Sequence, residues 1–410
     1  MDIPGLPARK GALKLIDAVL NRGETLDQAA NAALLGVKGN ADRALAKALA
    51  GEVLRWLTDI DGLIDSATRL VLAHDAKVRS VLRLMLAGWL RLETPPHAVI
   101  ATALPLLVGG PRRLAHGVFS TLVKRAVTLP ATPTLPAEVA ARWGERAGAI
   151  ATGLGHLPAL DLVLRDPAET ADWAQRLGGV SLLPGHLRLG RGTAVENLEG
   201  YDAGAWWVQD LAASLPARLL GSGAGRAVLD LCAAPGGKTL QLAAAGWQVT
   251  ALDNNAKRLG RVEQNLARTG LSAEVVEADA LSWDPPALFD AVLLDAPCSA
   301  TGTCRRNPDV IHRIGLRQIA EQAALQAKLL ARAVDMVKPG GTLIYAVCSL
   351  EHEEGEDQAA RVELTRDPIR ADELPAGLEP SADGTLRTDP GMLAQAGGLD
   401  GFFIARWRKD

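Results

Sequence analysis

The chain has 410 residues, 48% of them hydrophobic and 22% charged, with a formal net charge of −3 at pH 7. This length allows two or three domains with cores of their own, and the composition is that of an ordinary soluble globular protein. No run of about 18 uncharged apolar residues occurs, and the first ten residues lack the pattern of a signal peptide, so we expect a cytoplasmic protein with no membrane partner.

Residues 8–126 show the helical periodicity of an all-α domain. Apolar side chains recur on single stripes, among them Val78, Val81, Leu82, Met85, Leu86 and Trp89. The first 130 residues hold 17 Lys and Arg against 11 Asp and Glu. Between residues 76 and 130 a single acidic residue, Glu93, faces eight basic ones: Lys77, Arg79, Arg83, Arg91, Arg112, Arg113, Lys124 and Arg125. Such a face is typical of phosphate contacts, the alternative being a solvated helical surface.

The order of features in this region resembles the NusB-like RNA-binding domain. The residues that carry the resemblance are Ala8-Arg-Lys-Gly-Ala-Leu13, Val81-Leu-Arg-Leu84 and His116-Gly-Val-Phe-Ser-Thr-Leu-Val-Lys-Arg125. An asparagine usually stands near the position of His116 in that family. We therefore expect a NusB-like helical domain over residues 1–128.

A segment with mixed patterns follows. Leu129–Pro136 contains three prolines and two threonines, as linkers do. We expect a linker and a small substrate-binding subdomain over residues 129–215. Within it, Trp206 and Trp207 are either stacking platforms for bases or core residues, and we favour the core.

From Arg226 strands and helices alternate, which predicts a doubly wound parallel sheet over residues 216–410. We expect strands at 227–231, 249–252, 274–277, 291–294, 342–347 and 402–407, and helices at 256–269 and 318–337. Polar residues stand where these strands end: Asp230, Asp253, Asp279, Asp295 and Cys348. Ligands bind outside the carboxyl ends of such strands, so one crevice should collect these side chains.

The stretch Val228–Thr239 reads as a strand, a Pro-Gly-Gly turn and the start of a helix. This arrangement brings backbone N–H groups and a helix N-terminus to the tip of a strand. A P-loop would need glycine where Cys232 stands, and the Gly-x-Gly-x-x-Gly fingerprint of dinucleotide enzymes is absent. A carboxylate at Asp253 can accept the ribose hydroxyls of a nucleoside, and Asp279 can accept an adenine amino group, although both are also favoured helix caps. S-adenosylmethionine, an adenosyl ligand without phosphates, is therefore the expected cofactor.

The remaining chemistry rests on cysteines. The four in the chain are Cys232, Cys298, Cys304 and Cys348, and no Cys-x-x-Cys pair with supporting histidines indicates a metal or a disulfide framework. Cys298 and Cys348 follow adjacent strands and are candidates for thiolate chemistry. A thiolate that adds to carbon 6 of a pyrimidine makes carbon 5 nucleophilic toward a methyl sulfonium, and a carboxyl group at ring N3 makes the addition easier.

The motifs Asp230-Leu-Cys-Ala-Ala-Pro-Gly-Gly-Lys-Thr239, Asp295-Ala-Pro-Cys-Ser-Ala-Thr-Gly302 and Cys348-Ser-Leu-Glu351 resemble those of the Sun/RsmB family of RNA 5-methylcytosine methyltransferases. The resemblance implies a class I, Rossmann-like methyltransferase domain that modifies carbon 5 of a cytosine in small-subunit (16S) ribosomal RNA through a cysteine-linked intermediate. It places the cofactor-binding residues at Cys232, Ala233, Ala234, Pro235, Gly236, Gly237, Lys238, Asp253, Asp279 and Asp295. It places the nucleophile at Cys348 and the cysteine of product release at Cys298, with Asp295 also facing the cytosine ring.

Other assignments stay open. DNA cytosine methyltransferases use the cysteine of a Pro-Cys motif as nucleophile, which would select Cys298. The substrate could instead be tRNA, or the chain could be a non-catalytic RNA-binding or antitermination-type factor. Cys304, Asn307 and Val347 depart from the family pattern beside the reacting groups. We expect a monomer that binds ribosomal RNA and no metal.

Overall fold

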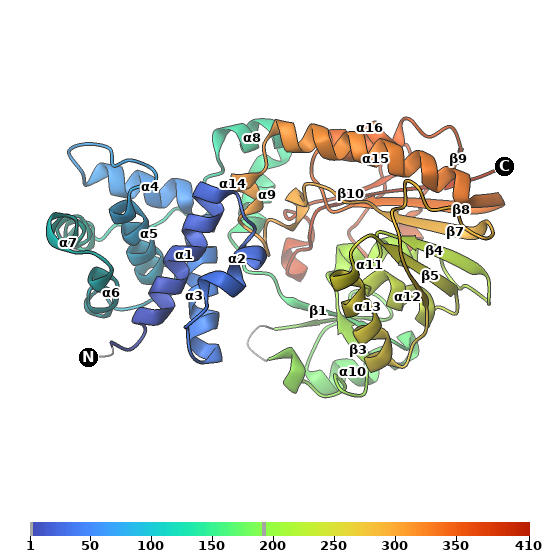
Figure 1. Cartoon of the computed structure of the whole chain (residues 1–410), viewed down its shortest axis with the longest axis horizontal. Coiled ribbons are helices and arrows are strands. Elements are labelled where there is room, and N and C mark those ends of the chain that lie inside the picture. Colours follow the sequence, from blue (N-terminus) through green and yellow to red (C-terminus); the bar gives the residue numbers. More distant parts are fainter. Residues whose placement is uncertain (1–2, 191–193) are drawn as a thin grey trace. The chain divides into compact units, whose positions relative to one another are not determined.

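The computed structural model describes residues 3–190 and 194–410 and divides the chain into two compact units (Figure 1). One unit contains the residues up to His156 together with Cys304–Ile314, and the other contains Leu157–Thr303 together with Gly315–Asp410. The chain therefore passes between the units three times, after residues 156, 303 and 314. The short segment Cys304–Ile314 belongs to the N-terminal unit although it lies in the C-terminal half of the sequence.

The first unit is all-helical. Its α-helices among the described residues are α1 (Leu6–Arg22), α2 (Leu26–Ala33), α3 (Asn40–Arg55), α4 (Leu57–Ser66), α5 (Lys77–Leu90), α6 (Pro96–Ala103), α7 (Gly109–Lys124), α8 (Ala137–Trp143), α9 (Ala147–Leu154) and α14 (Val310–Arg313). Helix α14, from the late segment, packs on α1. Two hydrogen bonds anchor that segment inside the unit: Arg55 donates to the carbonyl of Arg305 at 2.9 Å, and His312 Nε2 lies 2.6 Å from the carbonyl of Leu54.

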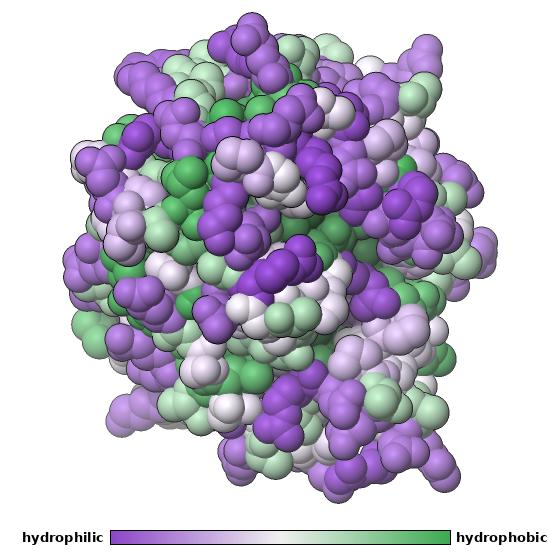
Figure 2. All heavy atoms as spheres, turned by 90° about the vertical axis from the view of Figure 1, so that its right-hand side faces the viewer, coloured by the Kyte–Doolittle hydropathy of each residue, from purple (hydrophilic) through white to green (hydrophobic). Residues whose placement is uncertain are grey.

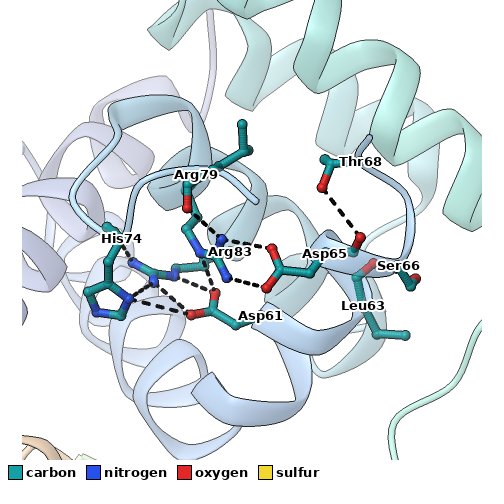
Figure 3. A network of polar contacts seen from close by, with 9 residues as sticks. Asp61, Leu63, Asp65, Ser66, Thr68, His74, Arg79 and Arg83 are labelled. Atoms are coloured by element: carbon teal, nitrogen blue, oxygen red, sulfur yellow. Dashed lines mark hydrogen bonds and ion pairs between the residues drawn. The ribbon is translucent and has the colours of Figure 1, made fainter. Parts of the chain in front are cut away.

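Helix α5 lies at the centre of this unit. All its residues from Arg79 to Gly88 are buried, whereas the sequence pattern predicted an amphipathic helix with a basic face. A helix buried on every side must satisfy its charged residues internally. Asp61 of α4 does this: its two oxygens accept hydrogen bonds from Arg83 at 2.8 and 2.7 Å and one also accepts from Arg79 at 3.2 Å (Figure 3).

The expected basic face is therefore wrong at three of its eight positions. Arg79 and Arg83 are buried in ion pairs, and Arg91 pairs with the buried carboxylate of Glu52 at 2.8 Å. Spacing along one helix could not reveal these partners, because Asp61 and Glu52 lie on other helices. The remaining five are exposed: Lys77, Arg112, Arg113, Lys124 and Arg125.

The second unit begins with a small antiparallel sheet in the order β2–β1–β3. Its strands are β1 (Leu160–Leu164), β2 (His186–Leu189) and β3 (Trp206–Val208), and α10 (Thr170–Leu177) lies between the first two in sequence. Trp206 is fully buried and Trp207 is 3% exposed, so both belong to the core, as we favoured, and neither offers a free face for a base.

The large sheet of this unit has the order β10–β11–β8–β7–β4–β5–β6, with β9 paired to β11. Its strands are β4 (Ala227–Leu231), β5 (Gln248–Asp253), β6 (Glu274–Glu277), β7 (Phe289–Asp295), β8 (Val337–Val347), β9 (Thr365–Arg366), β10 (Leu386–Thr388) and β11 (Phe402–Arg408). The five from β4 to β8 are parallel, and β11 runs antiparallel to β8. The predicted fold class, an all-α domain followed by an α/β domain with a Rossmann-like sheet, is confirmed.

Alternating side chains bury both faces of this sheet. In β4, Leu229 and Leu231 pack with residues of α15 (Leu316–Met336), whereas Val228 packs with residues of α11 (Leu211–Arg218) and α12 (Gly237–Ala244). Helix α13 (Ala256–Thr269) packs in a further cluster with α12 and β3. Strand β5 lies on one side of β4 and β7 lies on the other. This reversal of strand order creates a switch point between β4 and β7, where α/β enzymes bind their ligands.

The surface on the side of the C-terminus is mostly hydrophilic, with small apolar areas between polar side chains (Figure 2). Apolar atoms contribute more than half of the surface of an ordinary globular protein, so these areas are unremarkable. In the part of the chain that the structure describes, no helix combines the length and the apolar character needed to cross a membrane.

Candidate active site

The loop between β4 and α12 contains backbone conformations that most side chains disfavour. Gly236, with φ of 103°, stands before the first residue of α12, and Cys232 has φ of 62°. A Cβ atom on Gly236 would lie 3.2 Å from the side chain of Val262 in α13. Glycine therefore permits both the left-handed backbone and the close approach of α13 at this turn.

A cavity of about 410 Å³ opens beside this loop, within the size range of small-molecule sites. It gathers residues from the ends of five parallel strands, from α13 and from α15: Cys232, Ala234, Leu252, Asp253, Asn254, Arg258, Ala278, Asp279, Ala280, Leu281, Asp295, Ala296, Pro297, Cys298, Ala300, Leu325, Leu329 and Cys348. We call this the strand-end cavity. It brings together seven of the residues singled out in the sequence: Cys232, Ala234, Asp253, Asp279, Asp295, Cys298 and Cys348.

The other predicted cofactor residues lie elsewhere. Ala233, Pro235, Gly237 and Lys238 line a second cavity of about 330 Å³, and Asp295 lines both. Gly236 lines neither of the two. The loop thus has residues facing two hollows that share Asp295, a division that the linear motif does not reveal.

The two carboxylates expected to hold a nucleoside differ in their surroundings. Asp253 is 2% exposed and accepts hydrogen bonds from the backbone N–H of Ala234 at 3.2 Å and of Asn255 at 3.1 Å. Asp279 is exposed, and it accepts one from the N–H of Leu281 at 3.0 Å. Each carboxylate oxygen has two lone pairs, so both side chains keep acceptor capacity toward the cavity.

Two thiols lie close together in the lining of the strand-end cavity. The sulfur atoms of Cys298, after β7, and Cys348, after β8, lie 3.4 Å apart. The pKa of Cys298 is raised well above that of an ordinary thiol by its hydrogen bond to Cys348, by burial, and by the negative charge of Cys348 and Glu354. Cys298 is therefore held as a neutral thiol beside Cys348.

Lys238 lies beside these groups. Its Nζ is 2.6 Å from Oδ2 of Asp295, and the side chain is largely buried. Burial alone would lower the pKa of Lys238, but Asp295, Asp230 and Cys348 together raise it. The lysine is thus a positive charge beside Asp295, Asp230 and Cys348.

The third cysteine of this unit, Cys232, has a neutral thiol of low reactivity. Burial, followed by the charges of Asp253 and Asp295, raises the pKa of Cys232 to about 12, so its thiol stays neutral. Cys304 is fully buried in the helical unit.

Sequence reasoning missed several residues of the site. Arg258 in α13 lines the strand-end cavity and donates to the carbonyl of Ala234 at 2.6 Å, and Asn254 follows Asp253 directly. Their position just after a strand end was a usable signal. Leu325 and Leu329 of α15 carried none, because an apolar residue that lines a cavity has the same helical spacing as one in the core.

Asp230 gives a prediction about pH. It is fully buried, Thr239 donates to one of its oxygens at 2.6 Å, and the other has no hydrogen-bond partner among the described residues. Burial raises the pKa of Asp230 to about 7. The folded protein therefore holds this proton more tightly than the unfolded chain, and stability should fall as pH rises from about 4 to about 7.

Asp230→Asn removes the ionisation, so it should flatten that fall and make the variant more stable than the parent above pH 7, by up to about 4 kcal/mol. Urea unfolding of both proteins across this pH range measures the effect. Asp284→Asn, a change of an exposed carboxylate, is the control. Parallel stability curves for parent and Asp230→Asn would contradict the assignment.

Comparisons with known proteins place this geometry in a family. Residues 217–408 match the family described as 16S rRNA methyltransferase RsmB/F, and residues 6–108 match the NusB family. The ribosomal RNA small subunit methyltransferase B of Xanthomonas campestris pv. campestris is 34% identical, over 98% of this chain and 97% of the relative. Its counterpart in Klebsiella pneumoniae subsp. pneumoniae is also 34% identical, over 97% of each chain.

Among solved structures, the crystal structure of PH0851 matches all of both chains with a TM-score of 0.73 at 22% identity, a likeness of fold. The full-length relatives carry the assignment, and they confirm both resemblances drawn from the motifs. The chain therefore belongs to the RsmB/F family of 16S ribosomal RNA methyltransferases that carry an N-terminal NusB domain.

Proposed function

We propose that this chain methylates carbon 5 of a cytosine in 16S ribosomal RNA, with Cys348 as the nucleophile and S-adenosylmethionine as the methyl donor. The observation that carries the proposal is the pair of sulfurs 3.4 Å apart in the lining of a cavity that Asp253 and Asp279 also line. Thiols that can attack a base and carboxylates that can bind a nucleoside are the two halves of this reaction.

The residues present fit an adenosyl ligand. Asp253 is held by two backbone N–H groups and lies 3.5 Å from Arg258, and its Oδ1 keeps a lone pair for a ribose hydroxyl. The exposed Asp279 can accept an adenine amino group. Leu325 and Leu329 supply apolar wall. When bound, S-adenosylmethionine supplies an electrophilic methyl group on a sulfonium.

Different residues of the protein carry out the different steps on the base. The Cys348 thiolate adds to carbon 6, forming a carbon–sulfur bond and making carbon 5 nucleophilic. We assign Asp295 to the cytosine ring, since it lines both cavities, and Lys238 to the balance of charge beside it.

After methylation, the carbon 5 proton must leave so that the carbon–sulfur bond can break and return the electron pair to Cys348. We assign its removal to Cys298. Its sulfur lies 3.4 Å from that of Cys348, and after the thiol has lost its proton to solvent the raised pKa of Cys298 makes the thiolate a strong base, to which the carbon 5 proton passes.

The helical unit offers an electrostatic surface for the RNA. Five of the eight basic side chains between residues 76 and 130 are exposed on it: Lys77, Arg112, Arg113, Lys124 and Arg125. Contacts with phosphates depend on such charges and weaken with salt. The four free cysteines fit a reducing compartment, so we place the protein in the cytoplasm, and we expect a monomer.

Labelled methyl transfer to 16S ribosomal RNA that lacks the modification tests the proposal. We expect label in the RNA, mapped at base resolution to 5-methylcytosine. The same assay on tRNA tests the alternative substrate. Label on adenine, on protein or on tRNA in place of 16S RNA would refute the proposal, as would a failure to bind S-adenosylmethionine in a titration.

Lys238→Ala should reduce kcat by about 100-fold, as loss of a preorganised charge does in other sites, with little loss of stability. The reason is that the variant leaves the Asp295 carboxylate unpaired beside Cys348. Steady-state kinetics and thermal unfolding measure the two effects, and Lys328→Ala, on an exposed part of α15, is the control. A large loss of thermal stability in this variant would show instead that Lys238 mainly supports the fold.

A further inference from the structure

A buried carboxylate lies close to both thiols and has no role in the reaction as proposed. Glu354 ends the short 3-10 helix η6 (His352–Glu354) that follows β8, and it is fully buried. Within the described ranges, no lysine or arginine forms an ion pair with it. An unpaired buried carboxylate is costly unless hydrogen-bond donors surround it, so its partners show what holds it there.

Those partners are four uncharged donors. The backbone N–H of Ser299 donates at 2.8 Å and Nε2 of Gln326 at 3.2 Å to one oxygen, while the hydroxyls of Ser299 and Ser349 donate to the other. Gln326 also donates to the carbonyl of Pro297 at 2.9 Å. The carboxylate thus uses its full acceptor capacity.

The positions of these donors in the chain are informative. Ser299 follows Cys298 directly and Pro297 precedes it, while Ser349 follows Cys348. The loops after β7 and β8 are also joined by a hydrogen bond from the N–H of Gly302 to the carbonyl of Cys348 at 3.0 Å. One carboxylate therefore accepts hydrogen bonds from the residue that directly follows each cysteine, Ser299 and Ser349.

We propose that Glu354 is a positioning residue that fixes the two cysteine loops against each other and so sets the separation and orientation of the Cys298 and Cys348 sulfurs. This inference rests on the proposed function, in which both sulfurs react with one base. It adds a residue that touches neither base nor cofactor and acts through the serines beside the thiols.

The physical reason is preorganisation. Hydrogen bonds to a buried carboxylate are about twice as strong as those between neutral groups, and misplacement of a reacting group by about 1 Å costs roughly 100-fold in rate. The charge has a second effect, since Glu354 contributes to the raised pKa of Cys298 and so helps to keep that thiol protonated.

Glu354→Gln in the full chain tests the proposal. An amide has a similar shape and can pair with the same four groups, because the serine hydroxyls can turn to accept, but it lacks the charge. Glu353→Gln, one residue earlier on the same short helix and exposed to solvent, is the matched control. Three quantities are measured: the affinity for S-adenosylmethionine, the rate at which RNA-linked protein forms in a Cys298→Ala background, and the pH profile of Cys298 alkylation by iodoacetamide.

For Glu354→Gln we expect cofactor affinity and the KM for RNA close to those of the control, and adduct formation slower by about 10- to 100-fold. Alkylation of Cys298 should shift to lower pH, which a purely structural role would not cause. The proposal is overturned by adduct formation at the control's rate, by an unchanged alkylation profile, or by a loss of cofactor affinity in proportion to the loss of rate.

Two provisions keep the result decisive. If Glu354→Gln does not fold, Ser299→Ala, which removes one hydroxyl from the carboxylate, is judged by adduct rate and cofactor affinity in the same way. If the parent protein itself transfers no methyl group to RNA, the proposed function fails, whereas a normal parent with a normal Glu354→Gln variant refutes only this inference. The alkylation profile needs no RNA and reports on Glu354 in either case.

Discussion

Cys348→Ala is expected to abolish methyl transfer, by a factor on the order of 10⁶, as removal of a nucleophile does in other covalent enzymes. The structure gives the physical reason. Cys348 and Cys298 share one site, but the raised pKa of Cys298 keeps its proton on sulfur, so Cys298 does not replace the lost nucleophile. No neighbouring group can replace it, because burial also keeps the thiol of Cys232 neutral.

Cys298→Ala is expected to have a different effect. Addition and methylation still occur, but the carbon 5 proton is not removed, so protein linked to RNA accumulates. Denaturing gels with labelled RNA and S-adenosylmethionine distinguish the two variants, and Cys304→Ala, outside both cavities, serves as the control that retains transfer. A covalent adduct formed by Cys348→Ala would reverse the assignment and make Cys298 the nucleophile.

The second large effect concerns the stability of the helical unit. Asp61→Ala should destabilise it by about 3 kcal/mol, since removing one partner leaves buried charges uncompensated. Arg83 is 1% exposed and Arg79 5% exposed in their side chains, and both depend on Asp61 (Figure 3). The change thus removes the carboxylate that pairs with Arg83 and one of the two that pair with Arg79 among the described residues.

Asp65→Ala is the matched control, because this carboxylate is 33% exposed and pairs with Arg79 alone. It should cost at most about 1 kcal/mol, as partly exposed pairs do. Urea unfolding with hydrogen exchange in α4 and α5 measures both variants. Equal losses from the two changes would show that the Arg83 pair contributes little.

The same pair predicts acid sensitivity. Burial would raise the pKa of Asp61, but hydrogen bonds and charge from Arg83 and Arg79 bring it below its ordinary value. A carboxyl with a lowered folded pKa contributes stability above its unfolded pKa, and that contribution is lost as pH falls below about 4. The parent should lose its advantage over Asp61→Ala in that range.

Much of the α/β unit could be predicted from the sequence. The bounds predicted for β4, β6 and α13 agree with the structure, because each is a short apolar or periodic run between clear turn residues. The gathering of Asp253, Asp279, Asp295 and Cys348 in one cavity followed from the rule that parallel strands end at one edge. Asp230, expected with them, is fully buried and lines neither cavity.

What the sequence could not provide depends on contacts between distant segments. Arg79 and Arg83 looked like surface charges, since nothing local shows that Asp61 reaches them. Glu354 looked like any acidic residue in a polar run, because two of its four donors belong to Ser299, 55 positions away, and a third belongs to Gln326, 28 positions away. The late strand β10 and the small sheet around β1 were missed for the same reason: their strands are short and pair across long intervals of sequence.

The segment Cys304–Ile314 has a consequence for the order in which the protein is made. Residues up to His156 leave the ribosome first, but their unit also includes this segment, which follows about 150 positions later. At about 5–20 residues per second, the interval is roughly 7 to 30 s. During that time α1 lacks its contact with α14, and the carbonyl of Leu54 lacks His312. The N-terminal domain can therefore be completed only when three quarters of the chain has been synthesised, which links the folding of the two halves in time.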